Sequence, residues 1–488
     1  MKEKSSQYEF SWGEQHSVIS TESWLRGYVY LRDIIANENK NVFMYVEKGT
    51  VHTYNATQDY PSAHNAGKII VEKGFIVQHL KKSRLIRVSF NNFVKKINSR
   101  DLKKLSNGEL SEFLNQYQEL YDLTWAYFKI SQPEYLEIAK ERLEKLLEKN
   151  LGKKEAVQAF ITLTTPTEID LIKEEEISAI ELSFKNNLME KDFLDHGEKF
   201  PWLFFNTYDK SVIIEFLRKK FSDWQEIPKQ KRQKQLGELN QGLEEHQKKY
   251  QNILAQIKDK EEVERLSKIF GSLAIDRLKL KKWWGGAEYL FLNFFKEISN
   301  RLDIAVKDLF MTYRFEEMMN FLENGKTLSK DEMTQREETY AFYLKEGILK
   351  FDSGQKAYGQ YYDLIGKYTK KHKSVNTIFG TPASVGKVKG RARIIKVEDL
   401  ERLLDDVKHF QKGDIMITTM TQPTMVMLAR RAAAIVTNEG GITSHASILA
   451  REFNIPCIVG TKIATEVIKD GDMIEVDADK GVVKIIKE

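Results

Sequence analysis

The pattern of apolar residues changes abruptly near residue 370, and this change constrains the fold more than any other feature of the sequence. Between residues 106 and 368, apolar positions recur at helical spacing within long charged segments. From residue 377 onward, glycines and short runs of β-branched residues dominate, which is typical of strands joined by turns. A chain of 488 residues also exceeds what one hydrophobic core usually organises. The sequence therefore predicts a multidomain protein with a mostly α-helical body and a separate C-terminal α/β domain.

Capping signals support the helical assignment of the body. Ser106-Asn107-Gly108-Glu109 has the pattern of a capping box, and Pro133 fits the first turn of a second helix. Ser329 begins a late helix three residues before an acidic side chain, and Gly325 has the position of a helix stop. We therefore expect an all-helical domain over residues 106–368.

The other segments have different textures. Residues 1–105 mix aromatic and β-branched runs with turn residues and predict a small mixed α/β region. Residues 369–376 are polar and predict a linker. Residues 377–488 predict a compact α/β domain of roughly 110 residues.

Residues 229–268 are rich in Lys, Gln and Glu, with apolar positions only sparsely placed. One interpretation is a long, largely solvated helix or helical hairpin. The other is a coiled coil that binds a partner helix, and the sequence leaves both open.

Composition argues against several classes of protein. Lys and Arg exceed Asp and Glu by only 76 − 71 = 5, spread along the chain, so no basic surface suggests a nucleic-acid partner. No apolar run approaches the roughly 18 residues of a membrane span, and the N-terminus lacks the apolar core of a signal peptide. The single cysteine, Cys457, precludes an intrachain disulfide and lies in an apolar stretch, where we expect an inert buried thiol. We expect a cytoplasmic protein without a membrane role.

One short segment carries chemistry. The strand-like AAAIVT, residues 432–437, is followed by Gly440-Gly441 and then by the helical pattern HASILAREF. Glycines permit backbone conformations that let a phosphate approach main-chain N–H groups. Thr443 and Ser444 are good cap residues, so His445 falls in the first turn of the helix.

A histidine in that position suits phosphate transfer. The helix N-terminus offers unpaired N–H donors to an anion, and its positive field disfavours the protonated ring, so the imidazole can act as a nucleophile. A histidine on a helix is more often structural, which is our interpretation of the other eight. Here the glycine pair, the hydroxyls and the strand-to-helix context favour a functional role. We predict a catalytic His445, a phosphate site built from Gly440, Gly441, Thr443 and Ser444, and no metal ligands.

The segment GGITSHASILAREFNIPCIVGT resembles the active-site signature of the phosphoenolpyruvate-utilising enzymes, a family that includes phosphoenolpyruvate synthase, pyruvate phosphate dikinase and rifampicin phosphotransferase. Residues 380–386 resemble the opening of the family's phosphohistidine domain, and Thr421-Gln422-Pro423 resembles its middle loop. The resemblance implies that residues 377–488 form a β/β/α swivelling domain phosphorylated on His445. Ser447, where alanine is usual, and Asn454, where glycine is usual, depart from the pattern without touching the phosphate-bearing position.

The helical body is similar in layout to the central helical domain of rifampicin phosphotransferase, which implies an acceptor site there. The segment from His196 to Leu203 carries a loose part of this likeness, although we expect His196 itself to be packed or to cap a helix. The aromatic and acidic residues near a second glycine pair are the candidates for the acceptor site. They are Trp283, Trp284, Glu288 and Tyr289. The Glu288 carboxylate could accept a proton from an attacking hydroxyl, whereas tryptophans at this density more often belong to a packed core.

The sequence lacks room for the family's other modules. An ATP-grasp domain or a phosphoenolpyruvate-binding barrel needs on the order of 200 to 250 residues, and residues 1–105 are too few. We therefore expect a phosphotransferase component that receives phosphate from a separate ATP-grasp or phosphoenolpyruvate-using partner, with Mg²⁺ and ATP bound through that partner and neither held tightly by this chain. The alternative is a phosphorylation-dependent regulatory or binding protein without a small-molecule acceptor. The sequence does not name the acceptor.

Overall fold

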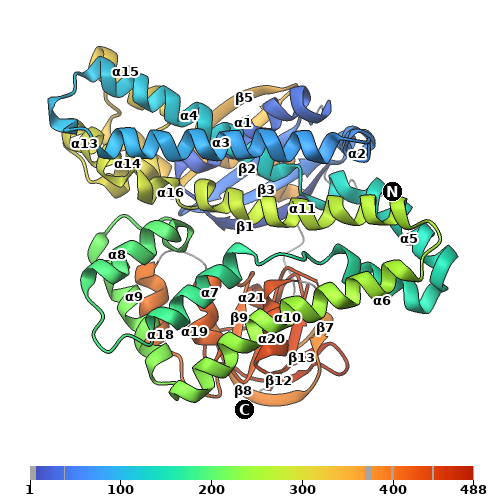
Figure 1. The fold of residues 1–488 in the computed structure, drawn as a ribbon. Coiled ribbons are helices and arrows are strands. Elements are labelled where there is room, and N and C mark those ends of the chain that lie inside the picture. Colours follow the sequence, from blue (N-terminus) through green and yellow to red (C-terminus); the bar gives the residue numbers. More distant parts are fainter. Residues whose placement is uncertain (1–6, 38, 369–375, 397–399, 442–443, 487–488) are drawn as a thin grey trace. The chain divides into compact units, whose positions relative to one another are not determined.

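The computed structural model describes residues 7–37, 39–368, 376–396, 400–441 and 444–486 (Figure 1). The chain forms two compact units. The first comprises residues 1–11, 16–208 and 224–365, and the second comprises residues 12–15, 209–223 and 366–488. The linker predicted at residues 369–376 lies outside the described residues except for Asn376.

A five-stranded sheet in the order β1-β3-β2-β4-β5 organises the N-terminal part of the chain. Its strands are β1 (Tyr8–Gln15), β2 (Val42–Glu47), β3 (Thr50–Ala56), β4 (Thr339–Lys345) and β5 (Ile348–Ser353). The strand β2 pairs antiparallel with β3 and with β4. The mixed α/β character predicted for residues 1–105 is therefore confirmed.

The expectation that residues 106–368 are entirely helical is wrong at β4 and β5. The run from Thr339 to Ser353 is rich in aromatic and β-branched residues and turns at Gly347, which has φ 79°. These strands complete the sheet begun almost 300 residues earlier, with Phe43 opposite Tyr343. The N-terminal region and the helical body consequently share one sheet and one compact unit.

Helices make up most of the first unit, and the long helices α3, α4 and α11 pack against one another (Figure 1). The capping box of Ser106 and Glu109, the cap at Ser329 and the left-handed stop at Gly325 are confirmed. The helices of the first unit are α1 (Val18–Ile35), α2 (Tyr60–Ile70), α3 (Phe75–Asn98), α4 (Asn107–Lys129), α5 (Pro133–Leu151), α6 (Lys153–Thr164), α7 (Leu171–Leu182), α8 (Glu190–Lys199), α10 (Lys229–Ala255), α11 (Lys260–Trp284), α12 (Ala287–Leu290), α13 (Leu292–Leu302), α14 (Val306–Thr312), α15 (Phe315–Asn324), α16 (Lys330–Glu338) and α17 (Gly354–Leu364).

The charged segment at residues 229–268 forms two helices, α10 and the first part of α11, joined by a turn at residues 256–259. Asn150 fixes this turn because its side-chain oxygen accepts from the Lys258 N–H at 2.8 Å. The predicted helical hairpin is therefore confirmed, and a coiled coil with a partner stays a prediction.

The second unit contains an eight-stranded sheet in the order β6-β13-β12-β8-β9-β10-β11-β7. The strands β8 (Lys387–Ile394), β9 (Ile415–Thr418), β10 (Ala434–Thr437) and β11 (Cys457–Val459) run parallel in its centre. The outer strands are antiparallel and comprise β6 (Thr377–Phe379), β7 (Thr381–Ser384), β12 (Met473–Asp477) and β13 (Val482–Ile485). The helices of this unit are α9 (Lys210–Gln225), α18 (Leu400–His409), α19 (Val426–Ala429), α20 (His445–Glu452) and α21 (Ala464–Val467). The last two residues of α9 belong to the first unit.

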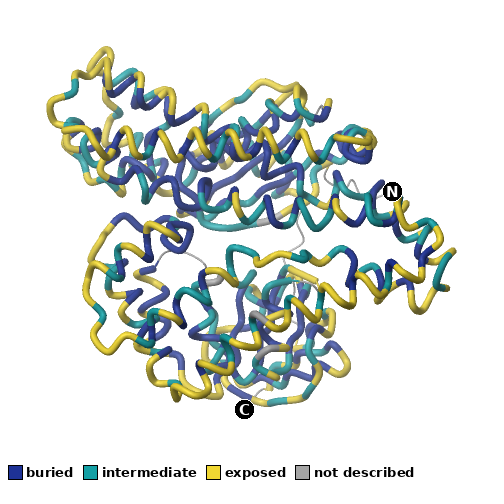
Figure 2. The backbone as a smooth tube through the Cα atoms, in the orientation of Figure 1, coloured by how far each residue is buried: buried dark blue, intermediate teal, exposed yellow. Residues whose placement is uncertain are grey.

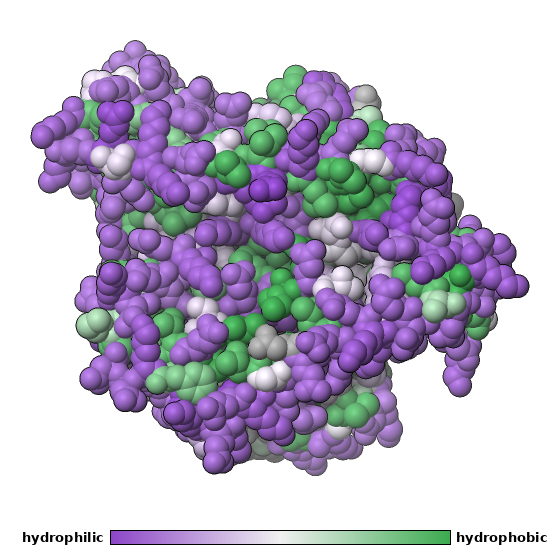
Figure 3. Space-filling view, viewed as in Figure 1, coloured by the Kyte–Doolittle hydropathy of each residue, from purple (hydrophilic) through white to green (hydrophobic). Residues whose placement is uncertain are grey.

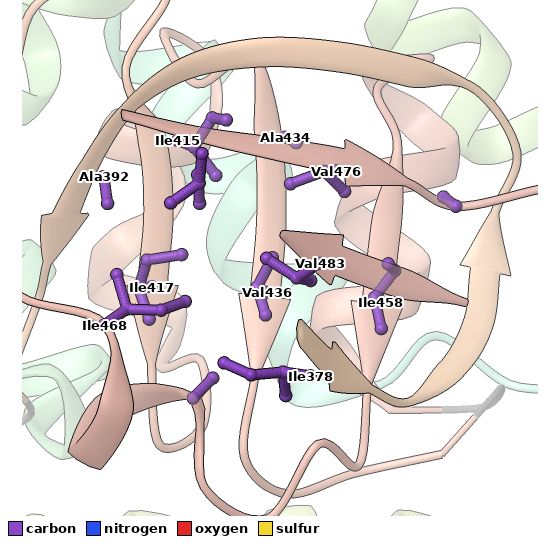
Figure 4. Close-up of a cluster of buried hydrophobic side chains, with 13 residues drawn as sticks. Ile378, Ala392, Ile415, Ile417, Ala434, Val436, Ile458, Ile468, Val476 and Val483 are labelled. Atoms are coloured by element: carbon purple, nitrogen blue, oxygen red, sulfur yellow. The ribbon is translucent and has the colours of Figure 1, made fainter. Parts of the chain in front are cut away.

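Aliphatic side chains from parallel and antiparallel strands share one core in this unit (Figure 4). Ile415, Ile417 and Val436 come from the parallel strands, and Val476 and Val483 come from the antiparallel ones. The strands β9, β10 and β11 are buried along their whole length and are apolar apart from the threonines that end β9 and β10, as expected of central parallel strands. Figure 2 shows buried backbone in the interior of each unit and exposed backbone on the outer turns. The predicted C-terminal α/β domain is confirmed.

The face of the molecule seen in Figure 3 is mainly hydrophilic, with apolar side chains scattered between charged ones. No helix within the described ranges is both long enough and apolar enough to cross a lipid bilayer.

Candidate functional site

The site around His445 forms where two neighbouring parallel strands end. The strand β9 leads into the loop that carries Thr421, and β10 leads through residues 438–441 into α20. Because parallel strands present their carboxyl ends at the same edge, these two loops meet there. Backbone bonds join them, since the N–H groups of Asn438 and Glu439 donate to the carbonyls of Thr418 and Thr419 at 3.1 and 2.9 Å.

His445 is the first residue of α20, as predicted from its sequence context. Ser444 is the N-cap, and its hydroxyl accepts a hydrogen bond from the Ser447 N–H. The imidazole therefore stands at the end of the helix where backbone donors and the positive end of the helix dipole favour an anion. Its side chain is half-buried, so it retains access to solvent.

Of the glycine pair, only Gly440 has a backbone conformation that requires glycine. Gly440 has φ 102°, and a Cβ placed there would lie 3.0 Å from both Cβ and Oγ of Ser444. At Gly441, no described atom lies within 4 Å of such a Cβ, which leaves open space in front of the loop. Thr443, predicted to bind phosphate, lies outside the described residues. The phosphate-binding roles of Gly440, Gly441 and Ser444 stay predictions.

Thr421 holds one nitrogen of the imidazole. Its Oγ1 lies 2.9 Å from Nδ1 of His445. If Nδ1 carries the proton and donates to Thr421, the lone pair for attack on phosphorus is on Nε2. The sequence marked Thr421 only as part of a familiar loop. No local signal links it to His445, because the two residues are separated by 24 positions and meet through strand pairing.

Ser447 explains one of the departures from the family pattern. Its hydroxyl donates to the Gly441 carbonyl at 2.7 Å and lies 3.0 Å from Ser444 Oγ. The side chain is buried, and it connects the first turn of α20 to the glycine loop. The substitution of serine for the usual alanine therefore adds a hydrogen bond inside the loop.

Two other residues noted in the sequence are structural. His196 is buried, with Nε2 2.9 Å from Oε1 of Glu175 and Nδ1 3.3 Å from the hydroxyl of Ser178, as expected of a packed histidine. Cys457 is buried within β11, and burial raises the pKa of its thiol to about 12. At neutral pH this thiol is protonated and unreactive.

Of the candidate acceptor residues, Trp283, Trp284 and Glu288 are buried in the first unit, and Tyr289 is half-buried. Trp283 stacks on Phe90 with ring centroids 5.1 Å apart, and Trp284 packs against Trp125 at 4.5 Å. Tyr289 packs against Phe204 at 4.8 Å. An acceptor could reach the tryptophans only if the surrounding helices moved apart, and their role in acceptor binding stays a prediction.

Glu288 is buried among hydroxyl groups. Oε1 accepts from Ser17 at 2.5 Å, and Oε2 accepts from Tyr208 at 2.8 Å. Burial raises the pKa of this carboxyl to about 7, although both hydrogen bonds favour the charged form. A carboxyl group with a pKa near neutrality can both take up and release a proton at physiological pH.

The described residues bring together no group of three or more His, Cys, Asp or Glu side chains that could hold a metal ion.

Comparison with known proteins points to the same segment. Residues 410–481 match the family model described as the mobile domain of PEP-utilising enzymes. A protein of Archaeoglobus fulgidus named as a probable phosphoenolpyruvate synthase is 47% identical over 104 residues, which are 21% of this chain and 13% of that protein. The phosphoenolpyruvate synthase of Pyrococcus furiosus is 51% identical over 94 residues, 19% of this chain and 11% of its own length.

A Bacillus subtilis protein named as an uncharacterized phosphotransferase is 38% identical over 125 residues, 25% of this chain and 14% of its own. The chain thus aligns with 11% to 14% of the length of these three relatives.

Proposed function

Since this chain carries the mobile domain of the phosphoenolpyruvate-utilising enzymes, we propose that it is a phosphotransferase component in which His445 carries the phosphoryl group. The observation that supports this most directly is the position of His445 as the first residue of α20, with Nδ1 2.9 Å from Thr421 Oγ1. That contact orients the ring, and when Nδ1 donates to Thr421 the lone pair is on Nε2.

The reaction consists of two displacements at phosphorus. In the first, the Nε2 lone pair of the neutral imidazole attacks the donor phosphate, a P–N bond forms, and the P–O bond to the leaving group breaks. Backbone N–H groups at the start of α20 and the Ser444 hydroxyl stabilise the phosphoryl oxygens. In the second, an oxygen of the acceptor attacks phosphorus, the P–N bond breaks, and the acceptor loses its proton to a base.

The acceptor binds to the helical body of the first unit. Glu288 is the candidate base, because its pKa of about 7 lets it accept a proton near neutral pH. The aromatic side chains of Trp283, Trp284 and Tyr289 would supply apolar surface if the surrounding helices open.

The phosphate donor is ATP or phosphoenolpyruvate, bound by a separate partner. A partner with an ATP-grasp domain would supply nucleotide binding and Mg²⁺.

A second candidate is a regulatory protein whose partner binding depends on phosphorylation of His445. Such a protein would undergo the first displacement, which phosphorylates His445, but not the second, which transfers the phosphoryl group to an acceptor. The buried Glu288 with its near-neutral pKa favours the transferase, because a regulatory protein has no evident use for a proton acceptor in its helical body.

The test is phosphate labelling of the full chain by an ATP-grasp protein encoded beside its gene, with labelled ATP, and by labelled phosphoenolpyruvate in parallel. We expect acid-labile, alkali-stable label on Nε2 of His445 in the wild type and none in His445→Ala. Label that persists in His445→Ala would refute the proposal. Label that forms on His445 but never leaves it, with any candidate acceptor, would favour the regulatory alternative.

A further inference from the structure

A cavity of about 380 Å³ lies within the first unit, between α3, the loop after α6, α10 and α11. It is separate from the glycine loop of His445 and from Glu288, neither of which lines it. Its volume falls within the range typical of small-molecule sites.

Positive charge dominates the lining of this cavity. Arg84, Arg87, Lys268 and Lys279 contribute four cations, against two acidic residues, Glu168 and Asp276. Lys268 pairs with Glu264 at 2.9 Å, and Lys279 lies 3.9 Å from Glu168. No ion pair involves Arg84 within the part of the chain that the structure describes, and this arginine is exposed.

An ion pair with Asp276 holds Arg87 in place. Its Nη2 donates to Oδ1 of Asp276 at 3.2 Å, and the same carboxylate also accepts from Ser83 and lies 3.2 Å from Nε2 of His79. Asp276 is buried, and its carboxylate is shared among these three partners. Because the carboxylate is already shared, it compensates the charge of Arg87 only in part, and the nearby charge of Arg84 adds repulsion.

Two buried polar groups of the lining are unsatisfied. Neither Nε of Arg87 nor the hydroxyl of Ser267 has a hydrogen-bond partner among the described residues. Ser267 is 1% exposed, and leaving a buried hydroxyl unpaired costs roughly 1–3 kcal/mol. A serine hydroxyl can turn between staggered rotamers to meet a ligand oxygen.

We propose that this cavity is a binding site for a small organic anion, with a phosphate or carboxylate group held by Arg84 and Arg87 and hydrogen-bonded by Ser267. Arginine guanidinium groups suit both anions because each presents several N–H donors in one plane. The remaining volume accommodates an organic part of the ligand against Leu80 and Ile275. This site stands on the helical body alone and does not depend on phosphorylation of His445.

The test uses the full chain and two probes, inorganic phosphate and citrate, measured by isothermal titration calorimetry. We expect saturable binding of at least one probe below about 5 mM, weakened by added salt. Arg84→Gln should lower the affinity by about tenfold, because it removes a charged hydrogen-bond donor. Binding of phosphate alone identifies a phosphorylated ligand, and binding of citrate alone identifies a carboxylate.

Matched variants separate this site from the rest of the molecule. Lys82→Gln removes an exposed positive charge from the same helix outside the lining, and should change the affinity less than twofold. Ser267→Ala should fold normally and weaken binding about threefold, since its hydroxyl has no partner to lose in the described chain. His445→Ala should bind both probes as the wild type does.

Two results would overturn the proposal. One is the absence of binding of both probes up to 5 mM, and the other is equal affinity in the wild type and Arg84→Gln. If His445→Ala abolished phosphate binding, the anion would bind at the glycine loop and not in this cavity, and the proposal would be wrong. Labelling of His445 in Arg84→Gln shows independently whether phosphotransfer itself remains intact.

Discussion

The orientation of the His445 ring depends on a hydroxyl delivered by a different strand. The 2.9 Å contact between Thr421 Oγ1 and Nδ1 orients the ring, and in the proposed function it directs Nε2 toward the phosphate. A single hydrogen bond of this kind is worth about 1 kcal/mol, enough to change a rate severalfold if it persists in the transition state.

We therefore predict that Thr421→Val slows phosphorylation of His445 by about fivefold, because valine keeps the shape of the side chain and loses the hydroxyl. Thr421→Ser retains the hydroxyl and should react within about twofold of the wild type. The measurement is the initial rate of acid-labile labelling. Equal rates in the valine variant and the wild type would remove Thr421 from the mechanism.

We expect alanine to affect stability differently at the two positions of the glycine pair. Gly440→Ala should destabilise the second unit by about 2 kcal/mol or more, because φ 102° and a contact at 3.0 Å with Ser444 both oppose a Cβ. It should also displace the N-cap of α20 and reduce labelling of His445. Denaturant unfolding measures the first effect.

Gly441→Ala is the matched control. A Cβ there meets no described atom within 4 Å, so we expect a change in unfolding free energy below about 1 kcal/mol. If both variants were equally stable, the strain assigned to Gly440 would be incorrect.

At the scale of elements, Glu288 lies where three segments meet. Ser17 is the N-cap of α1, Tyr208 follows η3 (Pro201–Phe204), and Glu288 lies in α12. The carboxyl thus connects the start of the chain to the middle of the helical body. Its protonation state affects how stably these elements pack.

The raised pKa makes this contribution depend on pH. The pKa in the folded protein, about 7, is above the ordinary value of 4.5, so the folded state binds more protons between these values. The stabilising contribution is complete below pH 4.5 and is lost as the pH rises through 7, by about 3 kcal/mol in all. Glu288→Gln should remove this part of the pH dependence.

The measurement is denaturant unfolding of the first unit from pH 5 to pH 8, comparing the wild type with Glu288→Gln. The difference in unfolding free energy between the two proteins should shift in favour of the variant as the pH rises. A difference that does not vary with pH would show that the carboxyl titrates normally. In a transfer assay, Glu288→Gln should accumulate phosphohistidine if Glu288 is the base.

At the scale of the whole molecule, the proposed function requires phosphate pick-up and delivery at different surfaces, so the carrier domain would have to move between them. We predict rigid-body rotation about the predicted linker at residues 369–376. Limited proteolysis should cut within this stretch and release a folded fragment of roughly 110 residues. Resistance there, with cleavage elsewhere, would contradict a swivelling domain.

Nucleotide binding is also a property of the whole chain. We predict that calorimetric titration of the full chain with Mg-ATP gives no binding in the micromolar range, because ATP would be bound by the partner. Micromolar affinity would place a nucleotide site within this chain and make a separate kinase unnecessary.

The sequence by itself determined those elements whose formation depends on residues a few positions apart. The β-branched runs after residue 377 predicted strands in the C-terminal domain, β10 among them. The helix caps at Ser106 and Ser329 were predicted from side chains that bond to nearby backbone, and the stop at Gly325 from the left-handed conformation that glycine favours. His445 in the first turn of α20 was predicted on the same grounds, because a glycine pair and a cap residue act within a few positions.

Tertiary structure decided what depends on distant partners. The strands β6 and β11 have three residues each and carry no periodicity of their own, so only pairing with neighbours forms them. The strands β4 and β5 join the N-terminal sheet across almost 300 residues, a pairing whose register the sequence does not contain. Thr421 contacts His445, and Ser17 contacts Glu288, for the same reason: burial and strand order bring together residues that no local pattern relates. Arg84 and Ser267, which come from α3 and α11, line one cavity through the packing of these two helices.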